Sequence, residues 1–220
     1  MTNVLESKKV PGLLYIPDLI TEEEEKDLFE ELDAEEWIPI TSSENSRVVQ
    51  HYGFKYDYMS GKPGEKTHPL PKFLNSLRDK LEKVCLEEGI IKEGYEFNQC
   101  IVNNYEPGQG ISDHVDHKDY GHTIGCFTIG SGAEMTFMRV QRMERGAKSK
   151  VIKVNIYPEP RSLYIMTGEC RKVWSHCMVG RKSDPNPTAL TLEGVKAMSE
   201  PKRIKRGRRI SVTFRKVPRK

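Results

Sequence analysis

Apolar positions in the first ninety residues recur with the spacing of two amphipathic helices. The first helix is expected to begin after Thr21, because threonine followed three positions later by Glu24 forms a capping box, and to end near Glu36. The second is expected over 71–88, where leucines form an apolar stripe. The segment 42–66 between them is rich in aromatic residues and has neither period, so we expect it to be irregular.

From residue 97 onward the pattern changes to short apolar runs divided by glycine and proline. Each run has the length and composition of a β-strand. The expected strands are 98–105, 112–116, 122–130, 133–139, 151–157, 162–167, 173–179 and 209–216. Many short, evenly spaced strands predict a sandwich or jelly roll. We therefore expect a mostly β (α+β) protein with an N-terminal helical layer.

The length of 220 residues allows one domain with a substantial core. We expect a single domain over 1–220, with the helices in 1–96 and the β core in 97–216. No run approaches the roughly 20 consecutive apolar residues of a membrane span, and the first residues lack the apolar stretch of a secretory signal. We expect an intracellular monomer, cytoplasmic or nuclear, without a membrane partner.

The number and spacing of the five cysteines do not predict a disulfide framework or a zinc site. An odd number with no Cys-x-x-Cys spacing argues against disulfides or a zinc ribbon. We expect reduced and mostly buried thiols in a reducing compartment. They are Cys85, Cys100, Cys126, Cys170 and Cys177.

Charge is distributed unevenly along the chain, although the net charge is only +3. Residues 1–60 contain 14 acidic and 5 basic side chains, whereas residues 201–220 contain 10 basic side chains and no acidic one. Such a basic end either approaches a polyanionic partner or is a solvated tail. With a nucleic-acid partner, several side chains could contact phosphates. These are Arg203, Lys205, Arg206 and Arg208.

His114 and Asp116 are separated by one residue, a spacing that places both side chains on the same face of an extended strand. His176, on another expected strand, could complete three ligands on one face of a metal. Two histidines and one carboxylate form the facial triad of non-haem Fe(II) oxygenases. A His-x-Asp tripeptide alone is weak evidence, and a lone histidine is more often an ordinary core residue.

The last expected strand supplies further support. Its alternation places Arg209 and Arg215 on one face and apolar residues on the other. Two arginines inside a jelly roll would be costly unless an anion neutralises them, and the arginine fork suits a dicarboxylate. The alternative is an edge strand whose arginines face solvent. Asn103 and Tyr105 share a face of an earlier strand and could donate hydrogen bonds to the same small acid.

Together these segments resemble the AlkB family of Fe(II)/2-oxoglutarate-dependent dioxygenases. The matching segments are 103–108, 114–116, 174–176 and 209–215. Segments similar to the oxygenase domain of the members that hydroxylate a modified wobble uridine in tRNA are 105–111, 161–163, 166–169 and 214–217. The resemblance implies a double-stranded β-helix (jelly roll) with N-terminal helices packed on one sheet, and a substrate lid within 1–96.

The resemblance also implies a role for each matching residue. The implied ligands of Fe(II) are His114, Asp116 and His176. The implied residues around the cosubstrate 2-oxoglutarate are Asn103, Tyr105, Arg209 and Arg215. Arg209 would pair with the far carboxylate, and Arg215 would belong to the catalytic site near the end that chelates the metal. Dioxygen would be the oxidant of this oxidoreductase.

The implied substrate is a modified base in DNA or RNA. A base inside a duplex cannot reach such a pocket, so the base must be single-stranded or flipped out. Alternating aromatic residues beside positive charge suit a single strand, although they could instead form a hairpin packed on the core. The expected substrate-binding residues are Arg47, Tyr52, Phe54, Tyr56 and Lys118. Lys118 stands where some repair members carry an acid.

Several activities are compatible with this resemblance. We expect oxidative demethylation of N-methylated bases in DNA or RNA. The nearest alternative is hydroxylation of a modified wobble uridine in tRNA. Further alternatives are a protein hydroxylase or demethylase on the same fold, and a catalytically silent nucleic-acid-binding module.

Overall fold

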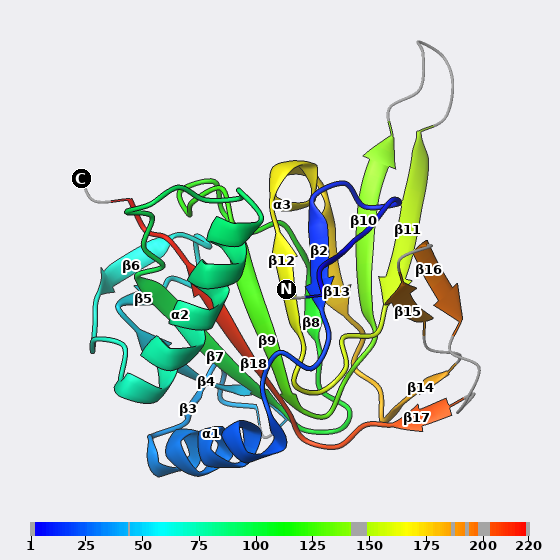
Figure 1. Ribbon diagram of the computed structural model, residues 1–220. Helices are drawn as coiled ribbons and strands as arrows, with labels where there is room; N and C mark the ends of the chain where they lie inside the picture. Colours follow the sequence, from blue (N-terminus) through cyan, green and yellow to red (C-terminus); the bar gives the residue numbers. More distant parts are fainter. Residues whose placement is uncertain are drawn as a thin grey trace.

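The computed structural model describes residues 3–43, 45–141, 149–185, 188–191, 194–197 and 203–218. Their main feature is a pair of antiparallel sheets that form a jelly roll (Figure 1). In spatial order, the larger sheet contains β1 (Leu5–Glu6), β2 (Leu13–Ile16), β12 (Leu163–Met166), β9 (Ile124–Gly130), β18 (Arg209–Arg215), β7 (Gln99–Tyr105), β4 (Val48–Tyr52) and β3 (Ile38–Pro39). The smaller sheet contains β11 (Lys150–Ile156), β10 (Met135–Gln141), β13 (Ser175–Met178) and β8 (Ile111–His114). The expected mostly β class is confirmed.

Two helices pack on the larger sheet, as expected, and α2 (Lys72–Glu87) lies across the front of β7, β9 and β18 in Figure 1. α1 (Glu22–Ala34) begins with the capping box: the Thr21 hydroxyl accepts a hydrogen bond from the Glu24 amide, and the Glu24 carboxylate accepts one from the Thr21 amide. α2 (Lys72–Glu87) buries one apolar stripe. The buried leucines of both helices share a core cluster with apolar residues of β18.

A second core cluster lies between the two sheets and fixes the strands that carry the site. Phe137 of β10 and Ile124 of β9 belong to it, and both are fully buried. β10 pairs with β13 in a register that places Phe137 opposite His176. The short helix α3 (Gly168–Val173) connects β12 to β13, so the strand expected over 173–179 is shorter and begins at Ser175.

β18 is the central strand of the larger sheet, between β7 and β9. Its alternation is confirmed. The apolar residues Ile210, Val212 and Phe214 are fully buried against the helices. The polar residues on the other face line a cavity between the sheets, and they are Arg209, Ser211, Thr213 and Arg215. The edge-strand alternative is therefore wrong.

The segment expected to be irregular over 42–66 is instead largely extended. β4 pairs with five residues of β7, and β5 (Phe54–Tyr56) pairs with β6 (Pro63–Lys66) as a hairpin. The sequence pattern did not predict β4, because this strand forms by pairing with a segment about fifty residues away along the chain. Gly53 joins β4 to the hairpin with a φ of +75°, and a Cβ there would lie 2.0 Å from the Asn98 carbonyl oxygen. This turn leads into the hairpin, whose residues Tyr56 and Tyr58 line a cavity together with His114 and Arg215.

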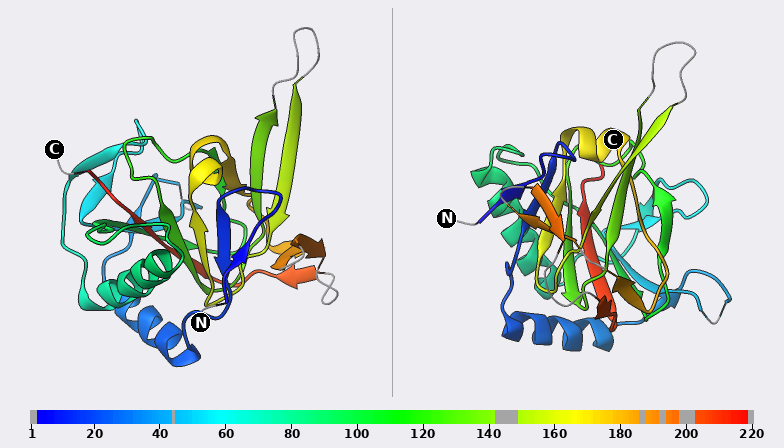
Figure 2. Two further views of the ribbon diagram at one scale, coloured as in Figure 1. Left: turned by 45° about the horizontal axis from the view of Figure 1, so that its top comes forward. Right: turned by 90° about the vertical axis from the view of Figure 1, so that its right-hand side faces the viewer.

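Two short ladders complete the described elements: β14 (Ser183–Pro185) with β17 (Arg203–Lys205), and β15 (Thr188–Thr191) with β16 (Gly194–Ala197). Figure 2 shows them beside the β10–β11 ribbon, on the side of the molecule away from the β5–β6 hairpin. All five cysteines are free thiols, four of them buried, as expected. Among the described helices, none is long and apolar enough to cross a membrane.

Candidate active site

Three side chains converge at the inner face of the smaller sheet. His114 is the last residue of β8, and His176 lies opposite it on the neighbouring strand β13. Asp116 follows two residues after His114. One ligand atom from each of the three lies within 4.8 Å of the others, which is a geometry that can hold a metal ion. Asp116 lies beyond the end of the strand, so the loop brings it to the metal position and strand alternation does not.

The charge state of Asp116 suits a metal ligand. Its carboxyl is 5% exposed, and burial alone would raise its pKa. Arg215 overcomes that effect with a hydrogen bond of 2.9 Å from Nε to Oδ1 and an ion-pair contact of 2.7 Å from Nη2 to the same oxygen, so the pKa lies well below its usual range. The other oxygen, Oδ2, lies 3.8 Å from Nε2 of His176. It is therefore an ionised oxygen that faces the metal position.

The surroundings of both histidines suit them to bind a metal. Burial, with a smaller effect from His114, lowers the pKa of His176 to about 4, so its imidazole is uncharged at neutral pH. Nδ1 of His114 lies 2.8 Å from the carbonyl oxygen of Ser112. Because a carbonyl only accepts hydrogen bonds, Nδ1 must carry the proton, and Nε2 keeps a free lone pair for a metal.

A buried arginine that the sequence analysis did not identify supports the loop after Asp116. Arg171 of α3 donates hydrogen bonds to four backbone carbonyls of this loop, at distances between 2.7 and 3.3 Å. These carbonyls belong to Asp116, His117, Tyr120 and Gly121. In the sequence Arg171 precedes Lys172 near the end of a short helix, a position typical of a solvated cation, so no local signal could have identified it.

Arg209 is the buried cation of the site that lacks a counter-ion. It is 4% exposed, it donates from Nη2 to Thr128 Oγ1 over 3.1 Å, and its Nε has no partner. None of the carboxylates that the structure describes forms an ion pair with it. A buried guanidinium without an anion is costly, and its planar fork suits a carboxylate. The chain therefore fits a dicarboxylate cosubstrate at this position.

The cavity next to Arg209 contains the other expected cosubstrate residues. Asn103, Tyr105 and Arg215 line it together with the three metal-position residues. The Tyr105 ring lies 5.6 Å from the Arg209 guanidinium. Burial raises the pKa of Tyr105, so its phenol is a neutral hydrogen-bond donor. The cavity thus combines a metal position at one end with a buried guanidinium at the other.

A second cavity, of about 170 Å³, adjoins the first and shares Asn103, Ile111, His114 and Arg215 with it. Tyr56 and Tyr58 of the β5–β6 hairpin line its outer side. The remaining lining residues are Arg47, Ile101 and Ser112. The rings of Tyr56 and Tyr120 are parallel, 6.4 Å apart, and both contact the Arg215 guanidinium. The hairpin therefore contacts the residue that holds Asp116.

The expected substrate-binding residues do not all lie at this cavity. Arg47 and Tyr56 do. Tyr52 is only 6% exposed in the core under the helices, and its hydroxyl donates to Gln50 Oε1, because alternation along β4 turns it away from the site. Phe54 is half-buried and Lys118 is exposed, and neither lines either of the two cavities at the metal position. Tyr52 is therefore a core residue.

Two of the arginines that could contact phosphates are paired with carboxylates of the protein. Arg206 is buried and donates to both oxygens of Asp184, over 2.6 and 2.7 Å. Arg208 donates to both oxygens of Asp33 on α1, over 2.6 and 2.7 Å. Arg203 and Lys205 of β17 remain exposed. The excess positive charge at this end of the sequence is thus partly neutralised by acids far away in the chain.

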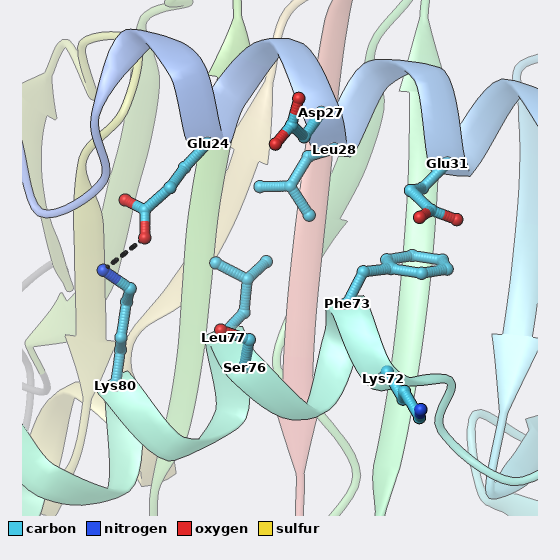
Figure 3. Close-up of a pocket in the computed structure, with 9 residues that line it drawn as sticks. All are labelled: Glu24, Asp27, Leu28, Glu31, Lys72, Phe73, Ser76, Leu77 and Lys80. Carbon is cyan, nitrogen blue, oxygen red and sulfur yellow. Dashed lines mark ion pairs between the residues drawn. The ribbon is translucent and has the colours of Figure 1, made fainter.

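A further depression lies between α1 and α2, away from the metal position (Figure 3). Leu28, Phe73 and Leu77 form its apolar surface, and an ion pair of 2.8 Å joins Glu24 to Lys80 across one end. These are the contacts that pack the two helices together. None of the residues that line the depression is a histidine or an arginine.

The geometry defines a class of protein: a two-histidine, one-carboxylate iron enzyme with a site for a dicarboxylate cosubstrate. The model of the 2OG-Fe(II) oxygenase superfamily matches residues 12–215, and the chain belongs to this superfamily. Its cofactors are Fe(II), 2-oxoglutarate and dioxygen, and it is a dioxygenase, as expected. His114, Asp116 and His176 could form the iron site.

Relatives of known name are AlkB-like. The chain is 33% identical, over 95% of its length, to mouse tRNA (carboxymethyluridine(34)-5-O)-methyltransferase ALKBH8, of which it spans 31%. It is 26% identical, over 94% of its length, to zebrafish probable RNA/DNA demethylase ALKBH6, of which it spans 86%. The resemblance to the AlkB family and to its tRNA-modifying members is confirmed, although the chain spans only about a third of the ALKBH8 relative.

A solved structure shows the same fold. The structure of OsALKBH1 aligns with a TM-score of 0.58, covering 97% of this chain and all of the other, at 14% identity. The identity is too low to transfer a function. The alignment does confirm that the jelly roll described above is the fold of 2-oxoglutarate oxygenases.

Proposed function

We propose that this protein oxidises a modified base in nucleic acid. The observation that carries the proposal is the cavity beside His114, which is covered by two tyrosines and adjoins the cosubstrate cavity. Aromatic side chains next to cationic groups suit a planar base, and a flipped or unpaired base could enter from the hairpin side. The relatives named for tRNA and for RNA/DNA support a nucleic-acid substrate.

In this proposal the side chains of the site bind and orient, and the cofactors supply the oxidation. Their chemistry is the decarboxylation of 2-oxoglutarate to succinate and carbon dioxide, coupled to transfer of one oxygen atom of dioxygen to a C–H bond. Arg209 and Tyr105 hold the far carboxylate of the cosubstrate. Arg215 keeps Asp116 ionised and oriented, and Tyr56 and Tyr58 place the base beside the metal and exclude water.

The position of the oxidised carbon determines the outcome. A hydroxylated N-methyl group leaves as formaldehyde and restores the base, whereas a hydroxyl on a carbon substituent remains as a modification. Demethylation of an N-methylated base in DNA or RNA is our first proposal, supported by the likeness to the probable RNA/DNA demethylase. Hydroxylation of a modified tRNA uridine is the second, supported by 33% identity to the tRNA enzyme. Either activity places the protein with nucleic acid, in the cytoplasm or nucleus.

Mass spectrometry of nucleosides tests this proposal. Total tRNA, methylated RNA and methylated DNA are incubated with protein, Fe(II), ascorbate and 2-oxoglutarate, and the nucleosides and succinate are measured. We expect loss of a methyl mass or gain of one oxygen in one nucleoside, with matching succinate. Asp116→Ala should abolish both signals, because it removes a metal ligand. Unchanged nucleosides in every nucleic acid would contradict the proposal, and succinate formed without them would come from turnover of 2-oxoglutarate that is uncoupled from substrate oxidation.

A further inference from the structure

We infer that the cavity under Tyr56 and Tyr58 discriminates by charge: it rejects positively charged bases and accepts neutral or anionic ones. This inference rests on the proposed function and names the substrate class of the same site. Some methylated bases, such as cytosine methylated at N3, are protonated and positively charged at neutral pH. Uracil methylated at N3 has nearly the same shape and is neutral. The charge of the pocket decides between such pairs.

The charged side chains that line the cavity are both cations. They are Arg47 and Arg215, and no aspartate or glutamate lines it. Arg215 is balanced by Asp116 through a hydrogen bond and an ion-pair contact to the same carboxylate oxygen. The positive charge that remains uncompensated at the cavity is therefore that of Arg47.

Arg47 is held in place by neutral groups. Its Nε donates to Asn103 Oδ1 over 3.1 Å, its Nη1 lies 3.5 Å from the Gly110 carbonyl oxygen, and its guanidinium lies 5.8 Å from the Tyr105 ring. None of its contacts in the described chain is with a carboxylate. A second cation in this partly buried cavity would face a like charge, which favours exclusion.

The acids nearest in sequence to the cavity point elsewhere. Asp57 accepts hydrogen bonds from the Met59 amide and the Ser60 hydroxyl in the hairpin turn. Asp113 lines a shallow groove with Cys177 on the opposite face of β8. Neither carboxylate can balance a cationic base in the cavity.

The uncharged groups around the cavity also favour a base rich in acceptors. Burial raises the pKa values of Tyr56 and Tyr58, so both hydroxyls are neutral donors. Burial, with smaller effects from Arg215 and Lys55, lowers the pKa of His51 to about 4, so His51 adds no charge. Donors of this kind match the two carbonyl oxygens of a uracil, whereas a cationic cytosine offers only one.

A matched pair of oligonucleotides tests the inference. Single strands of identical sequence carry one 3-methyluridine or one 3-methylcytidine, and formaldehyde release and binding by fluorescence anisotropy are measured for each. We expect the wild-type protein to prefer the neutral base at least tenfold, a difference of about 1.4 kcal/mol. Arg47→Gln should reduce that ratio towards one. Lys62→Gln, which removes an exposed cation of the same hairpin outside the cavity, should leave the ratio unchanged.

Comparing two bases on one variant cancels any effect of Arg47 on folding or on 2-oxoglutarate binding. Equal or better oxidation of the cationic base by the wild type would overturn the inference and leave the proposed function intact. If neither base is oxidised, the binding measurement tests the inference. Equal or tighter binding of the cationic oligonucleotide would then overturn the inference. If no nucleoside of total tRNA, DNA or RNA is oxidised, the proposed function fails and the inference fails with it.

Discussion

Each buried arginine in the site has a different set of acceptors, and those acceptors determine what it can do. Arg215 is paired with a carboxylate and orients a metal ligand. Arg171 satisfies backbone carbonyls and fixes a loop. Arg209 has one hydroxyl partner and is left to bind an incoming anion. Three side chains of one type thus position the metal, its loop and the cosubstrate.

At this scale we predict that Arg171→Met destabilises the protein by about 2–4 kcal/mol, because four carbonyls lose their donor in a buried environment. Affinity for Mn(II), used in place of Fe(II), should also fall, since the Asp116 backbone is no longer held. Thermal unfolding and metal titration measure the two effects. Lys172→Met, next to it and exposed, is the control. Unchanged Mn(II) affinity in Arg171→Met would limit Arg171 to a role in stability.

At the scale of elements, the β5–β6 hairpin connects the mouth of the site to its interior. Tyr56 contacts Tyr120 and Arg215, and the Tyr56 amide donates to Nδ1 of His51 over 3.3 Å. That hydrogen bond requires an unprotonated Nδ1. The docking of the hairpin therefore depends on His51 being neutral.

A pH dependence follows from His51. Its pKa of about 4 in the folded protein lies below its ordinary value of 6.5, so the unfolded chain takes up the proton first. Its contribution to stability is complete above pH 6.5 and is lost as the pH falls towards 4. We predict that the melting temperature falls less between pH 7 and pH 5 in His51→Gln than in the wild type. Parallel curves for the two proteins would remove His51 from this role.

At the scale of the whole molecule, the site joins the two sheets. The metal-position histidines come from β8 and β13 of the smaller sheet, and the guanidinium for the cosubstrate comes from β18 of the larger sheet. Metal and cosubstrate bound together therefore link the two walls of the jelly roll. Ligands that bind only the folded state stabilise it by mass action.

We predict that Mn(II) and 2-oxoglutarate together raise the melting temperature, by the equivalent of about 2.7 kcal/mol when the ligand is at a hundred times its Kd. Arg209→Ala should keep the increment due to the metal and lose the one due to 2-oxoglutarate. Asp116→Ala should lose both, because the cosubstrate chelates the metal. Scanning calorimetry measures these shifts. An undiminished 2-oxoglutarate increment in Arg209→Ala would contradict the assigned cosubstrate site.

Local periodicity was sufficient to predict the helices and the two faces of β18, and the resemblance to the AlkB family identified the three metal-position residues. The periodic features are encoded within a few neighbouring positions: a capping box at Thr21 and alternation from Arg209 to Arg215. The approximate strand positions followed in the same way. The sequence by itself therefore determined the class of fold and the chemistry of the centre.

The tertiary structure alone decided which neighbours each side chain would have. β4 forms by pairing with β7, and this pairing places the Tyr52 side chain in the core. Arg206 and Arg208 were expected to meet phosphates but found acids 22 and 175 positions away. Arg171 showed no local signal for its four carbonyls. Periodicity reports only the face on which a residue lies, whereas partners depend on contacts between distant segments, which form when the chain folds.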